Sequence, residues 1–152
     1  QYGGQGMGNL AMIVITEELS CASLAAAGSL ITRPEILTKA LLKGGTEEQK
    51  QTWLPPVAAG DLMVGISVTE PDTGSDVASV RCRAERGEQD GEAGYYISGA
   101  KAWCTFAVRA DVLALLARTN PDLKLGAKGL SLFIVPSDAA ASAIACGSAA
   151  LS

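Results

Sequence analysis

The sequence predicts an α+β fold in which a helical segment is followed by an antiparallel β-barrel or β-sandwich domain. Apolar residues in the first sixty positions recur every three or four residues, the spacing of helices, whereas from about Asp61 they alternate with a period of two, the spacing of strands. No helical pattern separates the expected strands, so parallel βαβ units are not expected. With 48% hydrophobic residues, the chain can bury a real core.

We divide the chain into three parts on this pattern. Residues 1–60 are expected to form the end of an N-terminal helical domain, residues 61–138 a middle β-domain, and residues 139–152 an alanine-rich tail to which we assign no function. The chain opens with Gln1 rather than Met, inside a glycine-rich turn, which we interpret as the sign of a piece cut from a longer protein.

Two helices are expected first. One starts at Asn9 and continues its apolar spacing to Leu24. Pro34 then suits the first turn of a second helix, PEILTKALLK, because proline has no N–H to leave unpaired there. The glycine pair at 44–45 is expected to stop this helix.

A third helix begins with a capping box. Thr46 is the expected N-cap, and Gln49 lies three residues later, where its side chain can bond back to the cap. The helix EEQKQTWL is expected to close at the proline pair 55–56, since proline lacks the N–H that a helix interior uses.

Five strands are expected in the β-domain. In VRCRAER, Val80, Cys82 and Ala84 alternate with charged residues, which is typical of a strand with one wet face. GEQDGEAG is a turn signal that joins this strand to the next as a hairpin. The expected strands span residues 62–69, 80–86, 94–99, 111–119 and 129–135.

Composition excludes several classes of function. A net charge of −4 and 5% aromatic residues argue against a nucleic-acid partner, which would need a basic patch and stacking rings. The chain has no histidine, which excludes Ser-His-Asp and Cys-His catalysis and the usual zinc sites. We therefore expect no metal site.

The cysteines and the apolar segments indicate a compartment. Adjacent Glu17 and Glu18 interrupt the longest apolar stretch, so we expect no membrane span. No basic leader precedes that stretch, which argues against a signal peptide. Widely spaced cysteines without a C-x-x-C pair favour reduced thiols in a cytosolic protein; they are Cys21, Cys82, Cys104 and Cys146.

The stretch SVTEPDTGSD, residues 67–76, is the first candidate site. Thr69 ends an apolar strand, Pro71 fixes the backbone, and Gly74 allows a positive φ. Such a loop presents N–H groups and hydroxyls outward, which suits a phosphate or a polar heterocycle. Taken alone, a decorated turn between two strands remains the favoured interpretation.

A second candidate lies in SGAKAWCTF. Trp103 and Thr105 are two residues apart, so on an extended strand both would point to one face. A flat indole beside a hydroxyl could wall a planar ring and bond its edge. A core tryptophan beside a β-forming threonine is the alternative, and periodicity alone leaves it open.

Together these segments resemble the central region of the acyl-CoA dehydrogenase family. The resemblance rests on SVTEPDTGSD, GYYISGAKAWCTF, DVLALLARTNPD and KGLSLFIVPSD, in this order and spacing. QYGGQGMG and GTEEQKQTWLPPVAAGD are similar to the family's helical region, so the resemblance covers about residues 1–138 and implies a truncated acyl-CoA dehydrogenase fold. DTGSD with WCTF resembles the 2-methylsuccinyl-CoA dehydrogenase branch.

The resemblance implies an FAD site. Backbone groups and the Thr69 hydroxyl would line the flavin, and Ser75 would lie near both the cofactor and the acyl-CoA. Trp103 would pack on the flavin face opposite the substrate, with Thr105 bonded near the reactive nitrogen. The expected cofactor-binding residues are Ile66, Ser67, Val68, Thr69, Gly74, Ser75, Trp103, Cys104 and Thr105, and Ser75 is also the expected substrate contact.

The resemblance also implies an activity: α,β-dehydrogenation of acyl-CoA thioesters by a full-length homo-oligomer that passes electrons to a partner protein. That enzyme would work in the cytoplasm, or in the mitochondrial matrix of a eukaryote. The family's base is a glutamate of a C-terminal helical domain and matches no residue here, so we assign no catalytic residue and expect the chain alone to be inactive. Two alternatives stay open: a flavin oxidase or monooxygenase of the same fold, and a non-catalytic interaction module.

Overall fold

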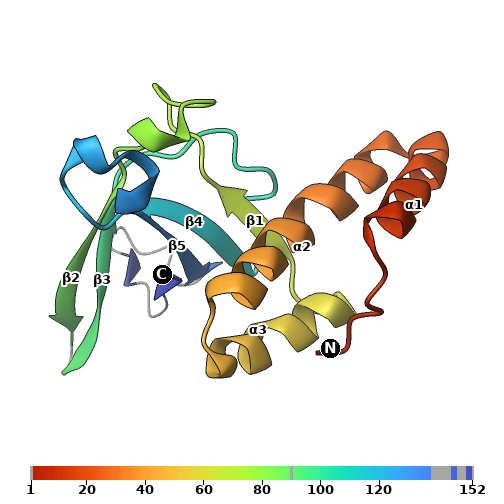
Figure 1. The fold of residues 1–152 in the computed structure, drawn as a ribbon, viewed down its shortest axis with the longest axis horizontal. Helices are drawn as coiled ribbons and strands as arrows, with labels where there is room; N and C mark the ends of the chain where they lie inside the picture. The colour runs from red at the N-terminus through yellow and green to blue at the C-terminus, as the bar shows by residue number, and fades with distance from the viewer. Residues whose placement is uncertain (1, 90, 138–144, 147–149, 152) are drawn as a thin grey trace. The chain divides into compact units, whose positions relative to one another are not determined.

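The computed structural model describes residues 2–89, 91–137, 145–146 and 150–151, which fall into two compact units, residues 1–64 and 65–152 (Figure 1). The first unit holds the helices, and the second holds nearly all of the sheet. The predicted α+β class is confirmed. None of the helices in the described part of the chain is long and apolar enough to cross a bilayer.

Ser23 separates the first two helices, α1 (Asn9–Ala22) and α2 (Leu24–Gly44). Its hydroxyl accepts a hydrogen bond from the Ala26 N–H at 3.3 Å and so caps α2. The predictions that the first helix reaches Leu24 and that the second starts at Pro34 are therefore wrong, because this cap starts α2 well before the proline. The buried apolar residues of the helical unit include Ala27, Leu37, Leu41 and Leu54.

The third helix, α3 (Glu47–Ala59), confirms the capping box. The Thr46 hydroxyl accepts from the Gln49 N–H at 3.2 Å, and the Gln49 side-chain oxygen accepts from the Thr46 N–H at 2.9 Å. The predicted end is wrong, because prolines 55 and 56 lie inside the helix. Gly60 ends it instead, at a left-handed φ of 84° that glycine adopts without strain.

The described residues of the second unit form a mixed sheet in the order β6-β3-β2-β4-β5-β7, with β1 also paired to β4. The β2–β3, β3–β6, β4–β5 and β5–β7 pairings are antiparallel, as expected, but β2 and β4 are parallel where Arg83 meets Arg118. The strands are β1 (Val64–Ser67), β2 (Arg83–Gln89), β3 (Glu92–Ser98), β4 (Val112–Arg118), β5 (Leu130–Pro136), β6 (Ala145–Cys146) and β7 (Ala150–Leu151).

The predicted hairpin is confirmed, but its strands reach further into the turn than expected, because β2 ends at Gln89 and β3 starts at Glu92. β2 and β3 pair from Arg83↔Ser98 to Gln89↔Glu92, and Gly91 takes a left-handed φ of 83° in the turn. In the tail, to which we assigned no function, β6 and β7 extend the two edges of the sheet. The rest of the tail lies outside the described residues.

The core of the β-unit is formed by buried side chains of β2, β4 and β5 and of the residues just before β2. Phe133 is fully buried, and its ring meets the Tyr95 ring edge-on, with centroids 5.1 Å apart. The other buried members of this cluster are Val80, Cys82, Ala84, Ala117 and Val135.

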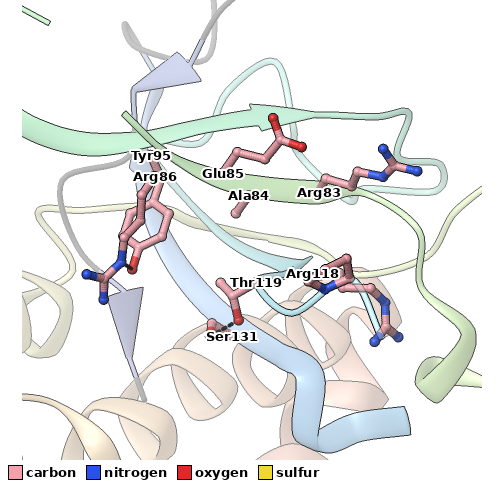
Figure 2. Close-up of a pocket in the computed structure, with 9 residues that line it drawn as sticks. Arg83, Ala84, Glu85, Arg86, Tyr95, Arg118, Thr119 and Ser131 are labelled. Carbon is pink, nitrogen blue, oxygen red and sulfur yellow. Dashed lines mark hydrogen bonds between the residues drawn. The ribbon is translucent and has the colours of Figure 1, made fainter. Parts of the chain in front are cut away.

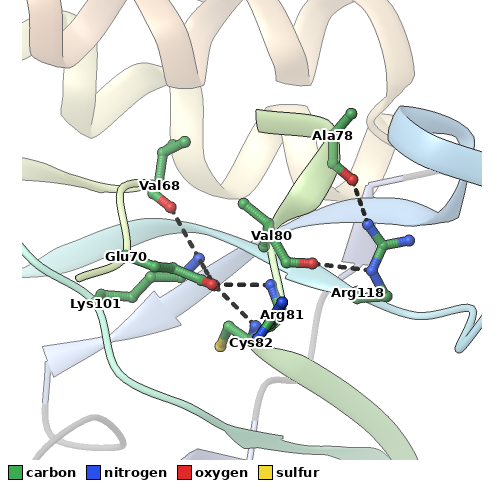
Figure 3. Close-up of polar contacts among 8 residues, drawn as sticks. All are labelled: Val68, Glu70, Ala78, Val80, Arg81, Cys82, Lys101 and Arg118. Carbon is green, nitrogen blue, oxygen red and sulfur yellow. Dashed lines mark hydrogen bonds and ion pairs between the residues drawn. The ribbon is translucent and has the colours of Figure 1, made fainter. Parts of the chain in front are cut away.

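The strand predicted at residues 80–86 starts later than expected, because residues 80–82 are not in a strand. Val77–Ser79 is a 3₁₀ turn (η1), and β2 begins only at Arg83. The carbonyls of Ala78 and Val80 accept hydrogen bonds from the buried Arg118 guanidinium at 2.7 and 2.9 Å instead of pairing in a ladder (Figure 3). A second 3₁₀ stretch, η2 (Leu123–Gly129), connects β4 to β5.

Gly65 in β1 leaves no room for a side chain. A Cβ there would lie 2.7 Å from Leu113 Cδ2 and 3.0 Å from the Ala110 Cβ, whereas a Cβ at Gly74 would meet nothing within 4 Å. We predict that Gly65→Ala lowers the free energy of unfolding by about 1–3 kcal/mol, the usual cost of overpacking, while Gly74→Ala changes it by less than about 0.5 kcal/mol. Urea unfolding measures both, and equal effects would contradict this packing.

Candidate functional site

The polar loop after β1 is a closed turn. The Glu70 N–H donates to the Thr73 carbonyl at 2.8 Å, and the Thr73 N–H donates back to the Glu70 carbonyl at 3.2 Å. The turn is thus complete before Gly74, whose φ lies outside the left-handed region. The expectation that Gly74 supplies a positive φ is wrong, because Pro71 and Asp72 already occupy the bend.

The Glu70 carboxylate is the centre of a buried polar network (Figure 3). The residue is only 8% exposed. Its Oε2 accepts from the Arg81 N–H at 2.8 Å, and its Oε1 accepts from the Cys82 N–H at 2.8 Å and from Lys101 Nζ at 2.9 Å. These donors explain why residues 81 and 82 are not in a ladder: their amides serve the carboxylate.

The environment of Glu70 favours its charged form. Burial alone would raise the pKa of this carboxyl, but the hydrogen bonds from the Arg81 and Cys82 amides and from the Lys101 ammonium outweigh burial and lower the pKa. Glu70 is therefore a carboxylate at neutral pH, with its oxygens already engaged.

Lys101 brings the two candidate segments together. Its ammonium donates to the Val68 carbonyl at 2.9 Å as well as to Glu70. One residue further on, the Ala102 N–H donates to the Thr69 carbonyl at 2.9 Å. The loop after β1 and the segment leading into Trp103 therefore lie side by side, as a shared site would require.

Trp103 and Thr105 are not on a strand, so the argument that alternation puts both on one face is wrong. The chain curls after Cys104, because the Ala107 N–H donates to the Cys104 carbonyl at 3.2 Å and the Ala110 N–H to the Phe106 carbonyl at 2.8 Å. Trp103 has a left-handed φ of 58° and is 90% exposed. Within this chain Trp103 is therefore not a core residue, and its indole is presented outward.

The other expected site residues differ in accessibility. Ser67 is buried in β1, while Ile66, Val68, Thr69 and Cys104 are half-buried, and Gly74, Ser75 and Thr105 are exposed. Burial raises the pKa of the Cys104 thiol, although a hydrogen bond with the Ser67 side chain acts against it. The thiol is therefore neutral at pH 7 and is a packing group rather than a nucleophile.

Sequence reasoning missed Glu70 and Lys101 as parts of the site. The available signal was their charge: Glu70 follows Thr69 directly and Lys101 lies two residues before Trp103, each in a segment otherwise expected to be in or next to a strand. Two opposite charges in two segments predicted to meet point to an ion pair between them.

A cavity of about 520 Å³ lies elsewhere on the β-unit (Figure 2). None of the expected site residues lines it. Thr119 and Ser131 share a hydrogen bond of 3.0 Å at its wall, and Arg86 lies over the Tyr95 ring, 5.8 Å from the centroid. Its lining residues are Arg83, Ala84, Glu85, Arg86, Tyr95, Arg118, Thr119, Pro121 and Ser131.

Solved structures of similar fold include acyl-CoA dehydrogenases. The glutaryl-coenzyme A dehydrogenase complex with glutaryl-CoA matches 89% of this chain and 33% of its own, at 33% identity and a TM-score of 0.76. An FAD complex of PigA matches 90% of this chain and 34% of its own, at 32% identity and a TM-score of 0.77. The fold class is that of these enzymes.

The sequence comparisons specify the family. Residues 1–61 match the acyl-CoA dehydrogenase N-terminal domain and residues 65–148 the middle domain. The chain is 42% identical to a (2S)-methylsuccinyl-CoA dehydrogenase of Cereibacter sphaeroides over 88% of its length, and 39% identical to a mitochondrial 2-methylacyl-CoA dehydrogenase of Solanum tuberosum over 89%. It covers 23% and 31% of these two relatives. The chain belongs to the acyl-CoA dehydrogenase family.

The Glu70 network generates a pH prediction. Glu70→Gln places an amide NH₂ among hydrogen-bond donors and leaves Lys101 without its carboxylate, so we expect a loss of about 3 kcal/mol of unfolding free energy at pH 7. Because the pKa of Glu70 is lowered on folding, its contribution is complete above the ordinary glutamate pKa of about 4.3 and disappears as the pH falls through the folded value.

Denaturant unfolding of wild type and Glu70→Gln between pH 7 and pH 3 measures this difference. The control is Glu35→Gln, which removes a partner of Lys39 from a solvent-accessible pair on α2 and should cost less than about 1 kcal/mol. A difference between wild type and Glu70→Gln that stays constant down to pH 3 would contradict the network.

Proposed function

We propose that this chain contributes part of the FAD site of an acyl-CoA dehydrogenase. The observation that carries the proposal is the Ala102–Thr69 hydrogen bond, which joins the polar loop after β1 to the segment that presents Trp103. Family membership supports it, and so does the FAD complex among the structural relatives.

The residues present fit a planar heterocycle. The exposed indole of Trp103 offers a flat apolar face, and the accessible hydroxyls of Thr69 and Thr105 can bond polar atoms at a ring edge. Backbone groups of Ile66, Ser67 and Val68 would line the ring, with Cys104 beside them. In the exposed segment after the turn, Gly74 would allow close approach and Ser75 would contact both cofactor and acyl-CoA.

The proposed reaction removes two hydrogens from an acyl-CoA thioester. A base takes the α-proton while a hydride leaves the β-carbon, so that a double bond forms between the two carbons. Bound FAD supplies the hydride acceptor. The task of this chain's residues is to hold the ring in one orientation and to keep water from one of its faces.

We propose that the base lies outside this chain. Glu70 is the carboxylate nearest to Thr69 in the sequence, but its oxygens accept three hydrogen bonds and its pKa is lowered, both of which oppose proton abstraction. Asp72 and Asp76 are exposed in the turn. We therefore propose that residues 1–152 alone have no dehydrogenase activity.

The proposed substrate is a short methyl-branched acyl-CoA of the 2-methylsuccinyl type. The support is the 42% identity to the Cereibacter sphaeroides enzyme, together with a second relative named for 2-methylacyl-CoA. The proposed full-length enzyme is a homo-oligomer that passes electrons to a partner protein. Free thiols at Cys21, Cys82 and Cys104 support a reducing compartment, the cytoplasm or the mitochondrial matrix.

The test uses the full-length protein that contains this chain. We expect it to carry FAD and to bleach an electron-accepting dye when given 2-methylsuccinyl-CoA. Thr69→Ala and Trp103→Ala should each weaken FAD binding by about tenfold. This is the scale of losing one neutral hydrogen bond or one aromatic stacking contact, respectively. Fluorescence titration with FAD measures the affinities.

Val108→Ala is the matched control, because Val108 lies in the turn after Trp103 and is fully exposed but has no proposed role. Its FAD affinity should equal that of wild type. Peroxide formation in air, in place of dye reduction, would favour the flavin oxidase. Unchanged flavin retention in both site variants would contradict the proposed site and favour an interaction module.

A further inference from the structure

In the Lys101–Glu70 ion pair little of either side chain is accessible to solvent, with 10% and 8% of their surfaces exposed. We propose that Lys101 is a positioning residue, and that its pairing with Glu70 and Val68 fixes the indole of Trp103 relative to the Thr69 loop. This inference rests on the proposed FAD site and adds a residue that does not touch the flavin.

Burying the two charges of this pair costs free energy. Two charges taken out of water lose hydration, and an apolar pair of similar volume often stabilises a fold at least as well. What an ion pair adds is direction: Lys101 Nζ reaches Glu70 Oε1 and the Val68 carbonyl, both at 2.9 Å. These two contacts fix the lysine against two points of one loop.

The backbone at Trp103 has a left-handed φ. A non-glycine residue with a φ of 58° is strained and stays so only where its surroundings hold it. On one side the turns after Cys104 hold the chain. On the other side stand the Ala102 N–H bond to Thr69 and, one residue earlier, the lysine. Lys101 is thus the side-chain anchor at the entry to the strained residue.

Glu70 and Lys101 do not depend equally on their ion pair. Without Lys101, Glu70 still accepts from the Arg81 and Cys82 amides, so the loop keeps its attachment to the start of β2. The segment before Trp103 would lose its two side-chain contacts. Lys101 variants should therefore disturb the indole while leaving the loop largely in place.

The experiment measures FAD affinity of the full-length protein well below its melting temperature. Lys101→Met, which has similar length and no donor, should weaken FAD binding by about tenfold or more, because small misplacements of a binding group are costly. Lys39→Met is the matched control: it removes the other ion pair described in this chain, on the accessible surface of α2, and should change the affinity by less than about twofold.

A double variant separates positioning from general stability. If Lys101 acts through the indole, then Lys101→Met in a Trp103→Ala background should weaken FAD binding by less than about twofold further, since coupled residues are not additive. A role that does not act through the indole predicts that the two effects multiply. If Lys101→Met does not fold, Lys101→Gln, which retains a side-chain donor, replaces it in the cycle.

The outcomes are distinct. A wild type that binds no FAD overturns the proposed function. A wild type that binds FAD while Lys101→Met binds equally well, or while the double variant is multiplicative, overturns the positioning role alone. Loss of folding in both Lys101 variants also overturns it, because the pair then serves the fold as a whole.

Discussion

The candidate site of the β-unit depends on the hydrogen bonds that the buried Glu70 carboxylate accepts. It accepts from two consecutive amides, Arg81 and Cys82, and from the ammonium of Lys101. Because these donors stabilise a buried anion, they join the loop after β1 to the residues just before β2 and to the segment before Trp103. The hydrogen bonds to this one carboxylate thus hold the three segments of the site together.

Arg118 completes this arrangement from the other side of the same segment (Figure 3). Residues 78–82 precede β2. The Cys82 carbonyl accepts from the Arg118 N–H of β4 at 2.7 Å, and the other backbone groups of the segment need partners outside the sheet. Glu70 takes two N–H groups, and the Arg118 guanidinium donates to the Ala78 and Val80 carbonyls. The bonds of the Glu70 carboxylate to amides and of the Arg118 guanidinium to carbonyls take the place of the strand pairing that alternation predicted for residues 80–82. The strand β2 therefore starts only at Arg83.

Local chemistry was predictable from the sequence where one or two residues decide the structure. The Thr46 capping box and the hairpin joining β2 to β3 are of this kind. Element ends that depend on tertiary context were not: α2 runs through Pro34 because Ser23 had already capped it, and α3 runs through its two prolines. Trp103 was placed correctly in a candidate site for a wrong reason, since a left-handed turn, not a strand, exposes its ring. The partners of Glu70 could not be predicted because they come from segments distant in sequence.

Amide hydrogen exchange of the folded protein tests the central claim most directly. If the Glu70 and Thr69 acceptors hold their donors as described, the N–H groups of Arg81, Cys82 and Ala102 exchange as slowly as ladder amides of β2 and β3, although none of the three lies in a strand. Exchange of these three amides as fast as that of exposed Ser75 would contradict the account, because the two halves of the site would then not be joined.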